Sequence, residues 1–259
     1  MDVNARKLHS ARYCGLRRVL SSAWYSLPVA LMAGPVLLLW VGAPLASHVL
    51  FLVGAAGLVW LVERARPNSG QAPGLANQIT LARALLAMAL LAALARPELF
   101  VAQGWFMVSV ALLVLLLDGV DGWVARRLDQ CTRFGARFDM EVDAALIMVL
   151  CLALWLSGQV AAWVLTIGVM RYAFVAASFI WPWLHGPLPD SFRRKLVCVL
   201  QVSALLFALS PLPGPGLQAA VLAAALLALV WSFAVDVLWL WRQRLPGASD
   251  SHPTYRSST

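Results

Sequence analysis

Charged residues are scarce in this chain. Asp, Glu, Lys and Arg make up 12% of the 259 residues, about half of the roughly 25% that a soluble domain carries. Hydrophobic residues reach 61%, and the twelve Trp are typical of side chains that collect at membrane interfaces. The composition therefore excludes an ordinary soluble domain and predicts that much of the chain lies in a lipid bilayer.

Cysteine and histidine are also few, with four of each. The cysteines are Cys14, Cys131, Cys151 and Cys198. They form no CxxC pair and no zinc-ligand spacing, and the histidines are scattered. We interpret the cysteines as reduced, and we expect no metal site built from Cys or His.

Acidic residues are outnumbered by basic ones, 12 against 20, which gives a net charge of +8. In a soluble protein this excess would indicate nucleic-acid binding. In a membrane protein, Lys and Arg instead mark the cytoplasmic loops. We therefore expect a lipid bilayer as the surrounding partner and no nucleic acid.

The sequence divides into four regions. They are a basic amphipathic segment at 1–26, a hydrophobic hairpin and linker at 27–70, a catalytic core at 71–245 and a polar tail at 246–259. The first is predicted to be a helix on an anionic cytoplasmic leaflet, with a disordered basic tail as the alternative. The hairpin has room for two membrane spans, with its turn at Gly42-Ala43-Pro44.

Six further apolar segments follow the hairpin. They are predicted at about 77–95, 100–127, 134–156, 160–182, 193–211 and 217–241. If the N-terminus is cytoplasmic and each segment crosses once, Arg96 is the only basic residue between spans on the opposite side. We therefore predict an all-α polytopic protein of the cell inner membrane, multi-pass, with its active site facing the cytoplasm.

Acidic residues gather in one pair of predicted helices. At about 100° per residue, Asp118 and Asp121 share one face of the first helix, together with Gly122, Ala125 and Arg126. Gly135, Asp139 and Asp143 step by four along one face of the next helix. If the two helices are antiparallel neighbours, the four carboxylates converge. The alternative is a set of helix-end acids balanced by Arg126, Arg133 and Arg137.

Four carboxylates cannot share a low-dielectric site without positive charge. Because no His or Cys lies nearby, the oxygen ligands favour hard ions, so we predict two divalent cations, Mg²⁺ or Mn²⁺. Such ions would clamp a diphosphate. Gly122 and Ala125 lack bulk, so a ligand could lie close to the helix, and Arg126 suits a phosphate.

The motif resembles the signature of the CDP-alcohol phosphatidyltransferase family, D-x2-D-G-x2-A-R-x8-G-x3-D-x3-D. Every spacer matches, with fixed positions at Asp118, Asp121, Gly122, Ala125, Arg126, Gly135, Asp139 and Asp143. Asn77, Thr80 and Arg83 are similar to the N-x-x-T-x-x-R opening of the family's first core helix. The resemblance covers roughly residues 75–242 and implies a six-helix CDP-alcohol phosphotransferase core.

The resemblance implies a transferase that moves a phosphatidyl group from CDP-diacylglycerol to a small alcohol and releases CMP, in phospholipid biosynthesis. Asp118, Asp121 and Asp139 would bind metal, and Asp143 would contribute to the metal site and act as the base for the acceptor hydroxyl. The donor-binding residues would be Gly122, Ala125, Arg126, Gly135, Asn77 and Thr80. The resemblance also suggests a homodimer.

Four basic residues are candidates for binding the acceptor. Arg83, Arg171, Arg194 and Lys195 are the candidate substrate-binding residues, because family members that use phosphate-bearing alcohols place cations in similar regions. For Arg83 and Arg171 the alternative is a buried arginine paired with a carboxylate. The segment from Arg194 resembles the G-K-x-K-T-x-x-Q of phosphatidylglycerophosphate synthases, but it has Arg194, Val197 and Cys198 where that motif has Gly, Lys and Thr. Glycerol 3-phosphate is thus one candidate acceptor.

Two other functions would use an intramembrane acidic cluster. A carrier would relay ions through it, but carriers commonly show repeated halves, and this sequence shows no internal repeat. An intramembrane prenyltransferase would also hold a diphosphate through metal ions, but its two acidic motifs lie far apart in sequence. In this chain one turn separates them.

Overall fold

The computed structural model describes residues 26–65, 75–128, 132–186 and 191–244. Its elements are α2 (Ser26–Trp40), α3 (Leu45–Ala65), α4 (Leu75–Ala93), α5 (Leu99–Ala102), α6 (Gly104–Arg127), α7 (Arg133–Leu156), η1 (Ala162–Val164), α8 (Leu165–Ile180), η2 (Pro182–His185), α9 (Phe192–Leu209) and α10 (Pro215–Arg244). The amphipathic segment expected at 1–26 and the tail at 246–259 lie outside the described residues, apart from Ser26.

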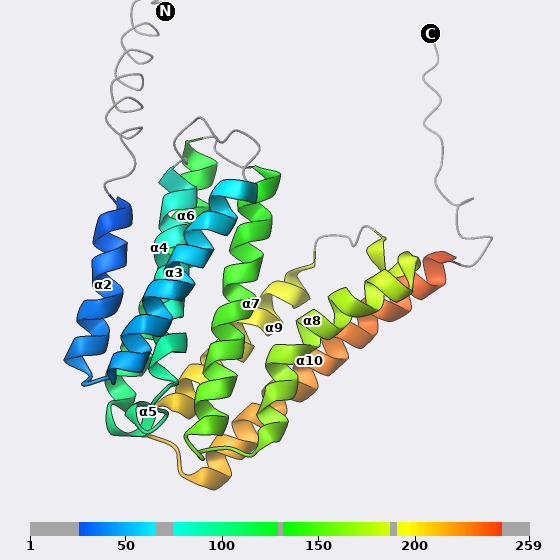
Figure 1. Ribbon diagram of the computed structural model, residues 1–259. Helices are drawn as coiled ribbons and strands as arrows, with labels where there is room; N and C mark the ends of the chain where they lie inside the picture. Colours follow the sequence, from blue (N-terminus) through cyan, green and yellow to red (C-terminus); the bar gives the residue numbers. More distant parts are fainter. Residues whose placement is uncertain (1–25, 66–74, 129–131, 187–190, 245–259) are drawn as a thin grey trace, which may run out of the picture.

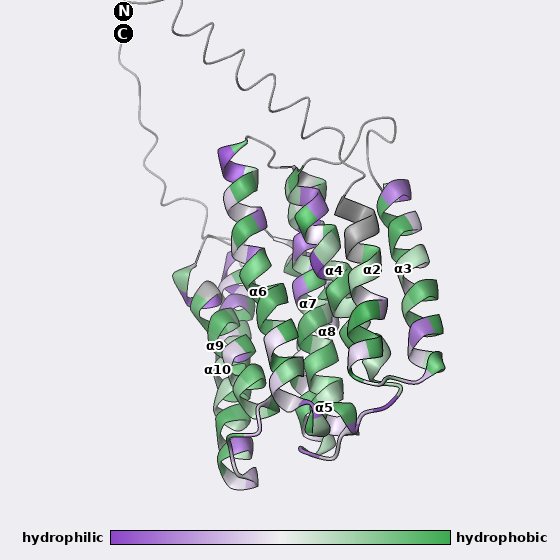
Figure 2. Ribbon diagram, turned by 90° about the vertical axis from the view of Figure 1, so that its left-hand side faces the viewer, coloured by the Kyte–Doolittle hydropathy of each residue, from purple (hydrophilic) through white to green (hydrophobic). Residues whose placement is uncertain are grey.

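The described part of the chain is helical throughout and contains no strand. Five helices are long and apolar enough to cross a membrane: Leu45–Ala65, Leu75–Ala93, Gly104–Arg127, Ala162–Ile180 and Pro215–Gln243. Apolar residues cover most of their length, and hydrophilic residues gather where α6 ends and α7 begins (Figure 2). The structure therefore confirms the all-α polytopic membrane class.

The predicted hairpin is present as α2 and α3. Gly42 ends α2 with a φ of 68°, a conformation that glycine adopts without steric cost. The amides of Gly42 and Ala43 donate to the carbonyls of Leu39 and Leu38 at 3.1 and 2.9 Å, which is a Schellman motif. The turn thus lies at the predicted position because Gly42 closes the helix and Pro44 follows it.

Small residues let the hairpin pack closely. A Cβ at Gly34 would lie 2.2 Å from Cζ of Phe51, and a Cβ at Gly54 would lie 2.6 Å from Sδ of Met88. Phe51 is fully buried. Glycine at position 34 therefore leaves room for the buried Phe51 ring between α2 and α3, whereas at Gly54 the flexible Met88 side chain would have to move.

Helix α4 lies at the centre of the bundle and packs against α2, α3, α6 and α7 (Figure 1). In its apolar window 61% of the residues are buried, against 17–28% in the other four spans. Helices α8, α9 and α10 form a second group, which is tilted away from α3 and α4 (Figure 1). In this group α9 packs along α10, and α8 joins the group to α7.

The segment predicted at 100–127 is divided in the structure. The short helix α5 ends at Ala102, and Gln103 has φ −118° and ψ 34° before α6 begins. Pro97 and Glu98 lie in a turn before α5 at one end of the bundle. The chain changes direction there, so α5 and α6 are separate helices. Consecutive long helices then run in alternate directions (Figure 1).

Candidate active site

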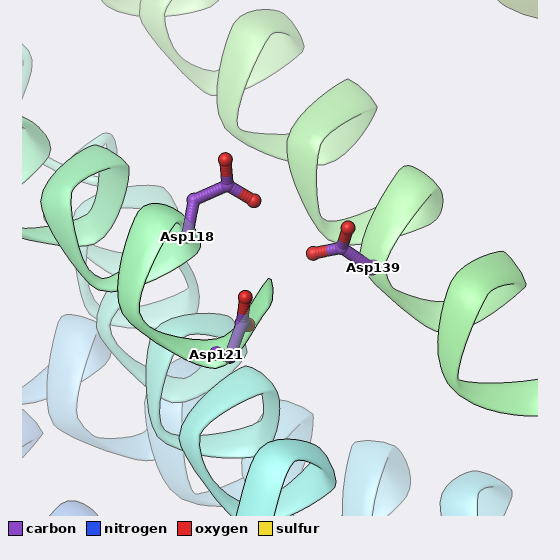
Figure 3. Close-up of side chains that lie close together, drawn as sticks. All are labelled: Asp118, Asp121 and Asp139. Atoms are coloured by element: carbon purple, nitrogen blue, oxygen red, sulfur yellow. The ribbon is translucent and has the colours of Figure 1, made fainter. Parts of the chain in front are cut away.

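The two acidic helices do not pack closely on each other, because α6 and α7 each pack on α4, but their carboxylates converge. Asp118 and Asp121 lie near the end of α6, and Asp139 lies near the start of α7. Ligand oxygens of these three residues lie within 4.8 Å of one another (Figure 3). The helical spacing therefore does bring the acids of the two helices to one place.

Arg83 of α4 lies among these acids. Its Nη1 donates to Asp121 Oδ2 at 2.7 Å and to Asp139 Oδ1 at 2.6 Å. Its Nη2 donates to Asp143 Oδ1 at 2.6 Å and forms an ion pair with Asp118 Oδ1 at 2.9 Å. Asp143 thus joins the other three through a guanidinium that touches all four carboxylates.

The four carboxylates differ in exposure. The side chain of Asp121 is 5% exposed, whereas those of Asp118, Asp139 and Asp143 are 35–38% exposed. Asp121 is also approached by Thr80, whose hydroxyl lies 2.9 Å from Asp121 Oδ2 and 3.0 Å from the Ala76 carbonyl. Asp121 is therefore the buried, hydrogen-bonded carboxylate of the cluster, and the other three carboxylates remain partly exposed.

A pocket of about 180 Å³ opens beside the cluster. Its lining residues are Ala76, Asn77, Thr80, Asp121, Gly122, Ala125, Arg126, Thr132, Gly135, Ala136 and Asp139. Every residue predicted to meet the CDP moiety is among them. Asp118, Asp143 and Arg83 are not, so the cluster has one side on the pocket and another side away from it.

Glycine keeps this pocket open. A Cβ at Gly135 would lie 2.8 Å from Oδ1 of Asn77 and 3.1 Å from Oγ1 of Thr132. Thr132 caps α7, since its hydroxyl accepts a hydrogen bond from the Gly135 amide at 2.9 Å. The sequence analysis did not include Thr132 in the site, although a threonine just before a helix is a recognisable start signal.

Arg171 lies apart from the carboxylate cluster. Its Nη2 donates to Glu141 Oε1 at 2.7 Å, and the two side chains are 33% and 57% exposed. Its Nε is buried and has no hydrogen-bond partner. Glu141 thus does not join the four clustered carboxylates, and it contacts α8 instead.

A second charged group joins α9 to α10. Arg193 donates to the carbonyl and hydroxyl of Ser232 and to Asp236, while Arg194 Nη1 lies 3.7 Å from Asp236 Oδ1. Asp236 of α10 is therefore paired with two arginines of α9. Nothing is described of the Lys195 side chain, so its assignment stays a prediction.

The cluster suits a hard divalent cation. Its ligands are carboxylate oxygens, and the four acids exceed the one buried arginine in charge. Mg²⁺ and Mn²⁺ prefer such oxygen ligands. The converging oxygens of Asp118, Asp121 and Asp139 provide the required donor set for at least one ion.

Comparisons with known proteins point to one family. The family model described as CDP-alcohol phosphatidyltransferase matches residues 74–233. No solved structure matches this chain. The matched segment begins one residue before α4 and ends within α10, so the hairpin of α2 and α3 precedes it.

Two curated relatives are similar to more than half of the chain. A Mycobacterium tuberculosis protein named "Probable phosphatidylglycerophosphate synthase" is 30% identical over 175 residues, which cover 63% of this chain and 82% of the relative. A Drosophila melanogaster protein named "Probable cardiolipin synthase (CMP-forming)" is 27% identical over 173 residues, 63% of this chain and 51% of the relative. The chain thus spans about half the length of the fly protein.

These matches confirm the family that the sequence motif indicated. They also confirm the class of enzyme, a transferase of phospholipid synthesis. The pocket and the acidic cluster are both built from the residues of that motif. This chain therefore belongs to the CDP-alcohol phosphatidyltransferase family.

Proposed function

We propose that this protein transfers a phosphatidyl group from CDP-diacylglycerol to a small alcohol and releases CMP. The proposal rests on one observation: Asp121 and Asp139 belong to the acidic cluster and also line the pocket. A diphosphate in the pocket would therefore reach the carboxylates, and the family match favours this reaction over a carrier or a prenyltransferase.

On the donor side, the pocket offers groups of the right chemistry for a nucleotide diphosphate. Arg126 supplies a guanidinium for a phosphate, and Asn77 and Thr80 offer polar side chains at the start of α4. Gly122, Ala125 and Gly135 leave room for the ligand between α6 and α7. We assign these residues to binding the CDP moiety.

Asp118, Asp121 and Asp139 would hold a divalent cation, and Asp143 would complete a second site. When bound, such ions neutralise the diphosphate and stabilise the attacking and leaving oxygens. The chain's own residues do the rest of the positioning: Thr80 and Arg83 fix Asp121 by hydrogen bonds at 2.9 and 2.7 Å.

The acceptor would enter on the other side of the cluster. Asp143 is 35% exposed and lies outside the pocket lining, while α9 packs against both α6 and α7. Arg171 of α8 donates to Glu141 of α7 at 2.7 Å, so it lies beside the helix that carries Asp143. We assign Asp143 as the base that takes the proton of the acceptor hydroxyl.

In this reaction the acceptor oxygen forms a bond to the lipid-linked phosphorus, and the bond from that phosphorus to the CMP oxygen breaks. CMP leaves with the electron pair, and the hydroxyl proton passes to Asp143. Positioning and charge stabilisation are the main contributions that a protein makes to such a transfer. Glycerol 3-phosphate is the first acceptor to test, because Arg171, Arg194 and Lys195 are basic.

The proposal places the site at the cytoplasmic face of the inner membrane. Arg64, Arg126 and Arg193 belong to the helix ends on the pocket side, whereas Arg96 lies at the other end, where its Nη1 contacts the Gly42 carbonyl at 3.4 Å. This distribution supports the positive-inside orientation. A homodimer, suggested by the family resemblance, stays a prediction that mass measurement in detergent would check.

The decisive experiment is an acceptor screen with CMP release as the readout. Purified protein in detergent is given CDP-diacylglycerol, Mg²⁺ or Mn²⁺, and a panel of alcohols that includes glycerol 3-phosphate, phosphatidylglycerol and inositol phosphate. We expect metal-dependent CMP release with one of them. The matched control is Asp121→Asn, and absence of CMP release across the panel would contradict the proposal.

A further inference from the structure

Arg83 uses most of its hydrogen-bonding capacity inside the protein. A guanidinium has five N–H donors, and four hydrogen bonds run from Arg83 to the Val114 carbonyl, Asp121, Asp139 and Asp143 at 2.6–3.1 Å. Asp118 adds an ion pair at 2.9 Å, and the Arg83 side chain is 0% exposed. Its donors are therefore directed at groups of the protein, which speaks against a direct role in binding the phosphate of a substrate.

The position of Arg83 also separates it from the pocket. Asp121 and Asp139 line the pocket, but Arg83 does not. It contacts both of these carboxylates from the buried side, through Nη1. Any ligand in the pocket would meet the carboxylates first, with Arg83 behind them.

Three helices meet at this one side chain. Arg83 belongs to α4, Asp118 and Asp121 belong to α6, and Asp139 and Asp143 belong to α7. The bond from Nε to the Val114 carbonyl fixes the plane of the guanidinium relative to α6. Arg83 therefore links the two acidic helices and compensates part of the charge of their carboxylates.

The cluster retains a net negative charge. Four carboxylates at such short distances repel one another strongly, and a single arginine leaves the cluster with a formal charge of −3. We propose that Arg83 is a positioning residue, an internal counter-ion that gathers the four carboxylates before divalent cations bind and limits how tightly those cations are held. This role deepens the proposed function and relies on it for the identity of the cations.

The counter-ion role is tested by a double-mutant cycle in thermal stability, with metal removed by EDTA. Arg83→Gln should lower the melting temperature in detergent by on the order of 10 °C, because it leaves partly buried carboxylates without their partner. Asp143→Asn combined with Arg83→Gln should recover a clear part of that loss, since it removes one of the repelling charges. Additive effects of the two substitutions would overturn the proposal.

A second measurement reports on the cations directly. Mn²⁺ binding, followed by the electron paramagnetic resonance signal of the free ion, should tighten at least roughly tenfold in Arg83→Gln, because a neighbouring positive charge has been removed. Unchanged or weaker Mn²⁺ binding would contradict the counter-ion role. If Arg83→Gln does not fold, Arg83→Lys replaces it: it should melt below the wild type while binding Mn²⁺ within about threefold of it.

Arg193→Gln is the matched control, since it removes another partly buried arginine that pairs with an aspartate, Asp236, of a neighbouring helix. It should lower the melting temperature and leave Mn²⁺ affinity unchanged; a similar rise in affinity would show that Arg83 has no special role. The cycle uses no lipid or nucleotide. If the acceptor screen contradicts the transferase proposal, the counter-ion result therefore still holds. If the counter-ion role fails, the transferase proposal is likewise unaffected.

Discussion

Two clusters of arginine and aspartate lie between helices of this bundle, and they differ in charge balance. Around Arg83, four carboxylates surround one guanidinium. Between α9 and α10, Asp236 is shared by Arg193 and Arg194, and Arg193 is also satisfied by Ser232 and lies 5.5 Å from the centre of the Trp231 ring. The first cluster has excess negative charge and borders the pocket. In the second cluster two arginines share one carboxylate.

This difference shows how to weigh an ionisable residue in a membrane protein. Burial at membrane depth makes any such residue a functional candidate, and by that criterion Asp236 and Asp121 are equal. Uncompensated negative charge and a place on the pocket wall distinguish Asp121 from Asp236. We therefore interpret the Arg193–Asp236 pair as a packing contact and the Arg83 cluster as the proposed site for cations.

The largest effect is expected from Asp121→Asn. This change removes the most buried carboxylate of the cluster, which Arg83 and Thr80 both contact, and it should lower CMP release by about 1,000-fold or more. Size-exclusion chromatography in detergent should still show a folded protein. Wild-type turnover in this variant would remove the metal assignment.

A smaller effect is expected from Gly135→Ala. The added Cβ would lie 2.8 Å from the Asn77 side chain, so the pocket narrows, and the KM for CDP-diacylglycerol should rise roughly tenfold. The matched control is Gly119→Ala in α6, where a Cβ meets no atom within 4 Å. An equal response in the two variants would mean that the pocket is not the donor site.

Arg171→Ala tests the acceptor side. Because the Nε of Arg171 is buried without a hydrogen-bond partner and Glu141 is its one carboxylate partner among the described residues, Arg171 retains donors for a ligand. Its loss should raise the acceptor KM by roughly tenfold while the donor KM stays within about twofold. Steady-state CMP release at varied acceptor and donor concentrations measures both, and an unchanged acceptor KM would return Arg171 to a packing role.

The smallest effect on activity is expected from Asp236→Asn. It leaves Arg193 without its carboxylate, so the protein should lose about 3 kcal/mol of stability, seen as a lower melting temperature. Its kcat/KM should remain within about threefold of the wild type, because the site lies elsewhere. A large loss of turnover at a temperature where the variant is folded would show that the second cluster also serves catalysis.

Much of the fold could be predicted because it depends on local pattern. The apolar runs give the long helices within a few residues, and Gly42 with Pro44 gives the hairpin turn. The four acids converge because steps of three and four residues place them on one face of each helix. A short connection then makes the two helices antiparallel, and both pack on α4.

The partners of the arginines could not be predicted in the same way. Periodicity tells which face of a helix a residue occupies, but not which helix packs against that face. Arg83 lies 38 residues before Asp121 in sequence, and Arg171 lies 30 residues after Glu141. Both pairs depend on the order of helices in the bundle, so the sequence alone left a substrate role and a buried ion pair open for each.

The covering of α4 has a consequence for the surrounding membrane. Asn77, Thr80 and Arg83 lie on the helix that α2, α3, α6 and α7 enclose, so protein rather than hydrocarbon is the medium around these polar groups. A change in bilayer thickness or acyl composition would act first on the outer spans. The polar residues of α4 are thereby separated from the lipids that surround the outer spans.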